Sequence, residues 1–241
     1  MARAFVAWLA VPEQRDWVDV GCGTGALLHA IAETRNPRSI VGIDASPGFV
    51  EYAKSRVAHP GVRFEVGDAR SLPRETGSAD AAVAGLLLNF VPEPVQALAE
   101  MTRVVRPGGA VAAYVWDYAG KMELMRYFWD AAVALDPDAE SLDEGRRFPI
   151  CHPTPLAAVM AQAGLTDVEV RPIDIPTRFR DFDDYWSPFL GGQGPAPGYV
   201  MSLEEGRRAA LRERIRSTLP RTSGGSIDLV ARAWAVRGRR R

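Results

Sequence analysis

The sequence is poor in the side chains that build metal centres and disulfide frameworks. Its 241 residues include two cysteines and three histidines, with no C-x-x-C or H-x-x-x-H spacing, so we expect no metal site. Cys22 lies inside a glycine-rich stretch that is unsuited to a disulfide, and Cys151 is the other cysteine. A reducing, cytoplasmic compartment is therefore expected. His59 and His152 are interpreted as surface or packed residues.

Long apolar runs and an excess of charge of one sign are also missing. No run approaches the roughly 18 residues of a membrane span, and the apolar segment 4–11 is too short for a typical signal peptide. We therefore expect neither a membrane partner nor a leader. The formal net charge is −1, so no overall field would attract a nucleic acid, and the basic end 237–241 is interpreted as a solvated tail.

Short apolar runs alternate with amphipathic segments along the chain, and 47% of the residues are hydrophobic. Strands are predicted at 17–20, 39–44, 62–66, 79–84, 110–116, 165–175 and 227–236. Helices are predicted at 2–10, 26–35, 47–57, 92–105, 121–135, 154–163, about 181–190 and 203–219. The remaining segments 106–109, 136–149 and 191–198 are expected to be turns or loops.

This alternation predicts an α/β fold with βαβ units. We expect one Rossmann-like, doubly wound domain over 1–241. Its sheet would be mainly parallel and seven-stranded, with an antiparallel last strand. A helical insertion, 178–222, would precede that strand and cover the substrate.

The stretch VDVGCGTG at 18–25 joins the first predicted strand to the first buried helix. Glycines allow a sharp turn and close approach of a ligand to the backbone, and the helix start offers free N–H groups to an anion. Gly21, Gly23 and Ala26 also satisfy the dinucleotide pattern G-x-G-x-x-G/A, so a nicotinamide dehydrogenase stays open. That alternative lacks a Ser/Tyr/Lys constellation at plausible spacing.

The segment DVGCGTG at 19–25 resembles motif I of class I S-adenosylmethionine (SAM)-dependent methyltransferases. The resemblance covers residues 16–116 and is strongest to small-molecule enzymes of the ubiquinone and menaquinone biosynthesis type. It implies SAM as the methyl donor, S-adenosylhomocysteine as the product, and in-line transfer to a small-molecule acceptor. No Asn-Pro-Pro-aromatic motif follows the fourth predicted strand, so nucleic acid and protein glutamine are not the expected acceptors. A SAM-binding regulator without catalysis is the other alternative.

The resemblance assigns the methionine part of SAM to the first turn. Backbone groups of Gly21, Cys22 and Gly23 would contact it, Gly25 would tighten the turn, and Asp19 would support the turn or the ammonium group. Each of these roles is carried over from the family motif.

Acidic residues after the next two strands are assigned to the rest of the nucleoside. Asp44, followed by Ala45, would bind the ribose hydroxyls, or would instead cap the next helix. Asp68 and the Ala69 N–H would contact the adenine, although Asp68 is also a typical turn-forming residue.

The fourth and fifth strands are expected to face the acceptor. The segment AGLLLNFVPEP at 84–94 resembles the family segment that passes under the sulfonium, which implies that Gly85 and Leu86 offer their backbone there. Asn89 would orient the acceptor or cap the following helix, and Asp117 would be a base, a substrate contact or a solvated acid. A base is needed only for a weakly acidic acceptor, so no catalytic residue is assigned firmly.

Two further expectations concern access to the site. The apolar set in the insertion would either line an acceptor pocket or pack as core; it comprises Tyr185, Trp186, Phe189, Tyr199 and Met201. Only about 15 residues precede the first strand, enough for two or three helical turns. We expect an unusually open site, closure by a second chain in a homodimer, or a missing upstream segment.

Overall fold

The computed structural model describes residues 1–191 and 194–241, and these residues form two compact units. The first unit comprises 1–115, 152–173 and 234–241, and the second comprises 116–151 and 174–233. Part of the loop expected at 191–198 therefore lies outside the described residues. Each unit is described by itself below.

The described residues form a seven-stranded sheet in the order β3-β2-β1-β4-β5-β7-β6. The strands are β1 (Asp16–Val20), β2 (Ser39–Asp44), β3 (Val62–Val66), β4 (Ala79–Gly85), β5 (Val105–Trp116), β6 (Thr166–Phe179) and β7 (Ile227–Arg239). β1 to β5 pair in parallel, and β7 lies antiparallel between β5 and β6. The predicted fold class is confirmed.

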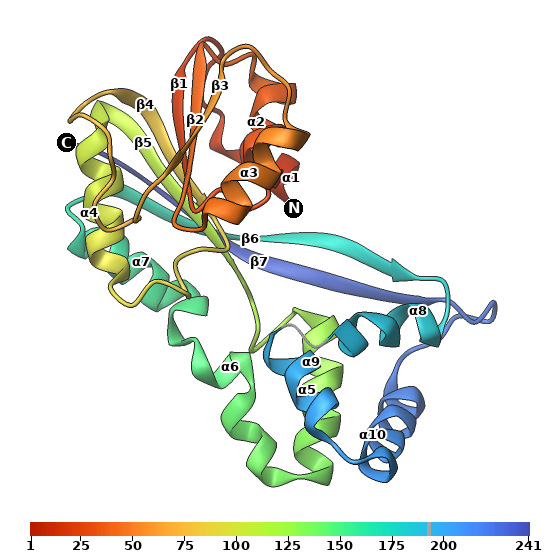
Figure 1. Ribbon diagram of the computed structural model, residues 1–241. Coiled ribbons are helices and arrows are strands. Elements are labelled where there is room, and N and C mark those ends of the chain that lie inside the picture. The colour runs from red at the N-terminus through yellow and green to blue at the C-terminus, as the bar shows by residue number, and fades with distance from the viewer. Residues whose placement is uncertain (192–193) are drawn as a thin grey trace. The chain divides into compact units, whose positions relative to one another are not determined.

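Five helices of the first unit follow from local signals that the sequence carries. They are α1 (Ala2–Leu9), α2 (Ala26–Arg35), α3 (Pro47–Arg56), α4 (Pro94–Val104) and α7 (Pro153–Gln162). The Ser46 side chain accepts a hydrogen bond from the Phe49 N–H at the start of α3, and Asn36 ends α2 with a φ of 40°. In Figure 1, α1, α2 and α3 gather beside β1–β3, whereas α4 lies close to α7.

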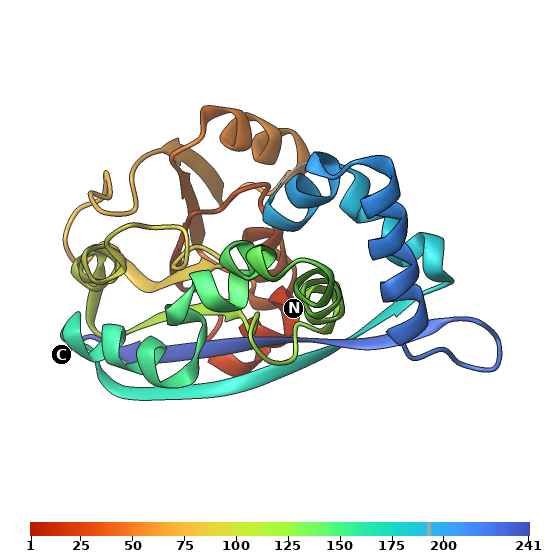
Figure 2. The ribbon, with the colours of Figure 1, turned by 90° about the horizontal axis from the view of Figure 1, so that it is seen from below.

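Strand lengths differ from the predictions where β5 and β7 pair. β5 begins at Val105, because Val105 pairs with Ala79 and Ala110 with Ala81, so the expected turn at 106–109 is a bulge within the strand. β6 and β7 run on to Phe179 and Arg239 as long neighbouring strands (Figures 1 and 2). β6 alternates mainly between half-buried and exposed residues and β7 between buried and half-buried ones, so apolar runs understate the length of both strands.

The second unit is helical apart from the distal ends of β6 and β7. Its helices are α5 (Glu123–Leu135), α6 (Glu144–Arg147), α8 (Phe182–Trp186), α9 (Pro195–Ser202) and α10 (Glu205–Thr218), with 3₁₀ turns at Pro137–Leu142, Pro149–Cys151 and Ser187–Gly191. The polar connection expected at 136–149 is built of short helical turns and not of an irregular loop. α9 was missed because its proline and glycine content favours a loop, yet Pro195 occupies the first helical turn, where its missing N–H costs nothing.

Aromatic side chains form the core of the second unit. The Phe128 and Phe189 rings stack with centroids 4.6 Å apart, and the Trp129 ring meets the Phe128 ring edge-on at 5.0 Å. Tyr185, Trp186, Phe189 and Tyr199 are buried in the same cluster, so these four side chains pack as core. Met201 differs, because 49% of it is exposed.

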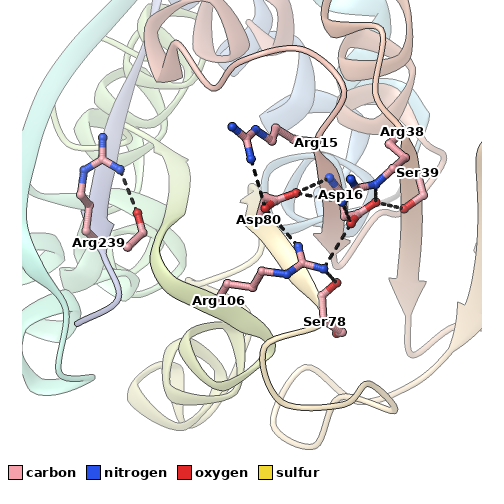
Figure 3. Close-up of polar contacts among 9 residues, drawn as sticks. Arg15, Asp16, Arg38, Ser39, Ser78, Asp80, Arg106 and Arg239 are labelled. Atoms are coloured by element: carbon pink, nitrogen blue, oxygen red, sulfur yellow. Dashed lines mark hydrogen bonds and ion pairs between the residues drawn. The ribbon is translucent and has the colours of Figure 1, made fainter.

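An ionic network ties together the amino ends of the parallel strands (Figure 3). The Asp16 carboxylate accepts hydrogen bonds from Arg38, from the Ser39 hydroxyl at 2.8 Å and from Arg106 at 3.3 Å. The Asp80 carboxylate accepts the Asp16 backbone N–H at 2.8 Å and lies 3.0 Å from Arg106. Hydrogen bonding from Arg38 is the main cause that lowers the pKa of Asp16 to about 2.

We expect Asp16→Asn to lower the free energy of unfolding at pH 7 by about 1–2 kcal/mol, allowing for the exposure of Arg38. The folded pKa lies below the ordinary value of about 3.9, so the stabilisation is present above about pH 4 and is lost as the pH falls toward 2. Urea titrations at pH 7, 5 and 3 measure this, with Asp130→Asn, whose side chain is 74% exposed, as the control. A pH-independent difference would contradict the prediction.

Candidate cofactor site

The loop between β1 and α2 is fixed by backbone hydrogen bonds. The Gly21 and Cys22 N–H groups both donate to the Ile43 carbonyl, at 2.7 and 3.0 Å, which joins the loop to the end of β2. Gly21, Gly23 and Gly25 have φ values of 68°, 52° and 88°, which favour glycine. A Cβ on Gly21 would lie 2.6 Å from the Leu87 side chain, whereas one on Gly23 would meet no described atom within 4 Å. Gly23 therefore faces open space.

Asp44 links this loop to the start of α3. Its carboxylate accepts the Gly23 N–H at 2.8 Å on one oxygen and the Ser46 N–H at 2.8 Å on the other. Ser46, and not Asp44, is the N-cap of α3. Because a carboxylate has about four acceptor positions, each oxygen of Asp44 keeps a lone pair for a further donor. Ala45 lies between these residues and is exposed.

Asp19 is a fully buried carboxyl group near the end of β1. Among the described residues, neither of its oxygens has a partner within hydrogen-bond geometry. Burial raises the pKa of Asp19 to about 8; the nearby Leu28 N–H in the first turn of α2 partly offsets the rise, and the charge of Asp44 adds to it. Burying a carboxyl group without a hydrogen-bond partner costs free energy. The surroundings of Asp19 therefore suit a ligand that brings a hydrogen-bond donor or a cation.

Cys22 and Tyr114 flank this carboxyl group without being reactive. Burial, with the charges of Asp19 and Asp44, raises the pKa of the Cys22 thiol, and burial raises the pKa of Tyr114. Both groups are therefore protonated at neutral pH, which argues against a nucleophilic role for Cys22.

Asp68 forms the turn that follows β3. Its carboxylate accepts the Arg70 backbone N–H at 2.8 Å and the Arg70 guanidinium at 2.7 Å. Arg70 thereby lowers the pKa of Asp68 to about 2 and keeps the group ionised. Arg70 also donates to Glu93, the N-cap residue of α4, at 3.2 Å. The turn-forming role expected for Asp68 is present, and Ala69 beside it is half-buried.

β4 ends at Gly85, and Leu86, which follows it, has a constrained conformation. The Leu86 N–H donates to the Tyr114 carbonyl at 2.8 Å, and Leu86 has a φ of 58°, which is unusual for a residue with a side chain. A Cβ on Gly85 would lie 2.7 Å from the Tyr114 hydroxyl oxygen. Tyr114 therefore requires glycine at this position, a role that no local sequence signal reveals.

The two weak catalytic candidates lie in different units. The side-chain oxygen and nitrogen of Asn89 are buried without a hydrogen-bond partner in the described part of the chain, and α4 is capped at Glu93, so Asn89 does not cap that helix. Asp117 belongs to the second unit and is 5% exposed. Its carboxylate accepts the Lys121 N–H at 2.9 Å, so the expectation of a solvated acid was wrong.

The order of the strands places the candidate site residues of the first unit in one row. β3, β2, β1 and β4 are neighbours, and the strands are parallel, so the residues that follow them meet at one edge of the sheet. The row runs from Asp68 through Asp44 and Gly21 to Gly85. Four strands at about 4.8 Å spacing span about 14 Å, the scale of an extended nucleoside derivative. The order of the chain reverses beside β1, where such sheets bind ligands.

Comparison with known proteins identifies the family. The family described as "Methyltransferase domain" matches residues 18–113. The demethylmenaquinone methyltransferase of Roseiflexus castenholzii is 32% identical over 181 residues, which cover 70% of this chain and 75% of that protein. This chain belongs to the class I SAM-dependent methyltransferases. Within the described residues, no helix is long and apolar enough to cross a membrane, and no cluster of metal-ligating side chains occurs.

Two further similarities extend this result. An uncharacterised 37.1 kDa protein of a Streptomyces fradiae transposon is 45% identical over 125 residues, which cover 51% of this methyltransferase-family chain but only 33% of that protein. The chain thus spans about a third of that relative's length. A putative methyltransferase from an antibiotic biosynthesis pathway of Anabaena variabilis has a TM-score of 0.66 at 19% identity, covering 97% of this chain and 95% of its own. The latter likeness shows the fold.

Proposed function

We propose that this methyltransferase-family chain transfers a methyl group from SAM to a small-molecule acceptor. The observation that carries the proposal is the buried, unpaired Asp19 carboxyl group at the glycine loop, in line with Asp44 and Asp68 at one edge of the sheet. SAM offers groups that match this row in the same order: an adenine, a ribose diol, and a methionine moiety with an ammonium group.

The ammonium group of SAM is proposed to bind beside Asp19. In the protein alone, the pKa of about 8 keeps Asp19 largely protonated at neutral pH. An adjacent cation would favour the carboxylate and lower that pKa. Binding at pH 7 would then release a proton, and the proton release distinguishes this assignment from one in which Asp19 only supports the turn.

The nucleoside is proposed to bind to the loops after β2 and β3. Each carboxylate oxygen of Asp44 accepts one hydrogen bond, from Gly23 or from Ser46, and its remaining lone pair would accept a ribose hydroxyl. Asp68, held ionised by Arg70, would accept the adenine amino group, and the Ala69 N–H would donate to the ring. Arg70 fixes the Asp68 carboxylate in advance of binding.

The acceptor is proposed to approach from the end of β4. SAM supplies a methyl group that its sulfonium already activates, so the protein chiefly aligns the acceptor and excludes water. The backbone at Gly85 and Leu86 would lie under the sulfonium, and the unpaired amide of Asn89 would hydrogen-bond the acceptor. Asp117, which is buried in its own turn, is not needed for this arrangement.

Residues 178–222 are proposed to supply the acceptor cover. Their buried aromatic side chains hold the second unit together. Leu190 and Met201 are 48% and 49% exposed, and these apolar side chains would contact the acceptor. We also propose a cytoplasmic location, which the two free buried cysteines support. Closure of the site by a second copy of the chain is part of the same proposal. The competing function, SAM binding without catalysis, predicts no S-adenosylhomocysteine release with any acceptor.

We expect calorimetry to show one site per chain for SAM and for S-adenosylhomocysteine, and none for NAD. Titration in phosphate and in Tris at pH 7 should give different apparent enthalpies for SAM, because Asp19 releases its proton. Asp19→Asn should abolish the difference between the buffers. NAD binding without SAM binding would refute the proposal, and equal enthalpies would refute the Asp19 assignment alone. S-adenosylhomocysteine release from pooled small-molecule acceptors then tests catalysis.

A further inference from the structure

A hollow of about 620 Å³ lies at the edge of the sheet opposite the candidate cofactor site, where the parallel strands begin. Its walls come from five segments of the first unit: 9–15, Asp80, 106–110, 167–169 and 237–239. β1 alone, with five residues, separates the two edges by roughly 15 Å. The volume is that of a site for a small organic molecule rather than for an ion alone.

Most charges around this hollow are already paired with each other. Arg237 donates to Glu169 at 2.7 Å and to the carbonyl of Trp8 at 3.0 Å. Arg106 lies 3.0 Å from Asp80 and donates to Asp16, as Figure 3 shows. These pairs are structural, and they leave little charge for a ligand.

Two guanidinium groups keep most of their donors. Arg15 approaches Asp80 only to 3.7 Å, and no hydrogen bond of its side chain occurs among the described residues. Arg239 donates through one nitrogen to the Gly108 carbonyl at 3.0 Å, which leaves its other nitrogens available. Both arginines line the hollow, and Figure 3 shows Arg15 beside Asp80 and Arg239 apart from the network of Asp16, Asp80 and Arg106. The exposed Asp167 is the one lining acid without an ion pair in the described part of the chain.

Apolar groups supply the remaining walls. Leu9, Val11, Pro12 and Pro107 line the hollow together with the backbone of Gly108 and Gly109. Guanidinium groups recognise carboxylate and phosphate with paired hydrogen bonds, and apolar walls favour a hydrocarbon body. A ligand that satisfies both features is a small organic anion.

We propose that this hollow is a second binding site, for a small organic phosphate or carboxylate whose anionic end lies between Arg15 and Arg239. The apolar part of the ligand contacts Leu9, Val11 and Pro107. Asp167 opposes the anion, so its charge limits the affinity. The site is independent of the proposed methyl transfer, because all of its lining residues lie at the amino edge.

NMR titration of the ¹⁵N-labelled full chain with phenyl phosphate, benzoate and inorganic phosphate tests the proposal. We expect phenyl phosphate to shift the amide signals of Val11, Gly108, Gly109 and Gly238. It should bind at least threefold more tightly than inorganic phosphate, because the apolar walls contribute. Comparison of phenyl phosphate with benzoate shows which anionic group the site prefers.

Charge variants give a sharper test, because the proposal predicts that some of them weaken ligand binding and that another strengthens it. Arg15→Gln and Arg239→Gln should each weaken phenyl phosphate binding at least threefold, whereas Asp167→Asn should strengthen it about twofold. Arg3→Gln, an arginine 71% exposed on α1, is the matched control and should change nothing. Unchanged melting temperatures confirm that the variants fold. Shifts confined to residues 21–25, equal affinities for phenyl and inorganic phosphate, or equal effects of all four variants would overturn the proposal.

Discussion

Replacing Asp44 by alanine is expected to weaken SAM binding at least tenfold and by up to about a hundredfold. The variant would remove the two charge-assisted hydrogen bonds proposed to the ribose. One such bond contributes roughly 1.5–3 kcal/mol net, a factor of about 10 to 100, and we expect water in the place of the carboxylate to compensate for the other. It also removes the acceptor for the Gly23 and Ser46 N–H groups, so the glycine loop loses its tie to α3. Calorimetry with S-adenosylhomocysteine measures the affinity without turnover.

Two companion variants separate ribose binding from loop support. Asp44→Asn keeps the size and one acceptor oxygen, so we expect a smaller loss of affinity than for alanine. Glu51→Gln, on α3 and 73% exposed, is the matched acid and should bind normally. An unchanged dissociation constant for Asp44→Ala would assign Asp44 to joining the two loops only. A lower melting temperature with normal affinity would lead to the same conclusion.

Replacing Phe128 by alanine is expected to destabilise the second unit by about 3–5 kcal/mol. Phe128 is fully buried, and its ring contacts Trp129, Phe189 and Tyr199. Removing it leaves a cavity among rigid aromatic rings that cannot collapse readily. The exchange of backbone amide hydrogens should accelerate more in α5, α8 and α9 than in β1 and β4.

Leu135→Ala is the control, because Leu135 lies at the end of the same helix and is 49% exposed. We expect it to change the stability by less than about 0.5 kcal/mol. A Phe128→Ala effect below about 1 kcal/mol, or equal acceleration of exchange in β1, would show that this cluster is not a separate core. Methyl-transfer assays on the same variants report whether acceptor turnover depends on the second unit.

Much of the first unit could be predicted because its signals are local. Ser46 followed by Pro47 fixes the start of α3, and Asn36 fixes the end of α2. β2 is a central strand whose buried residues form a continuous apolar run, and the edge strand β3 alternates apolar and charged residues. Both patterns are local, and both strands match their predicted bounds. Non-local pairing decided the extent of β5, which gains residues 105–109 because Val105 pairs with Ala79.

The sequence by itself determined the fold class, the glycine turn and the positions of Asp19, Asp44 and Asp68 after or near strand ends. Periodicity and turn chemistry act over a few residues, so one sequence is enough to recognise them. The roles of these residues in binding remain predictions. The tertiary structure alone decided that Asp19 lacks a partner among the described residues and that Asp44 holds Gly23.

The tertiary structure also decided which aromatic residues pack as core and which segments enclose the hollow beside Arg15. Leu9, Asp80, Gly108 and Arg239 are distant in the chain and become neighbours only through strand order. Burial, missing hydrogen-bond partners and raised pKa values depend on such distant neighbours, because desolvation and pairing are properties of the packed protein and not of the local sequence.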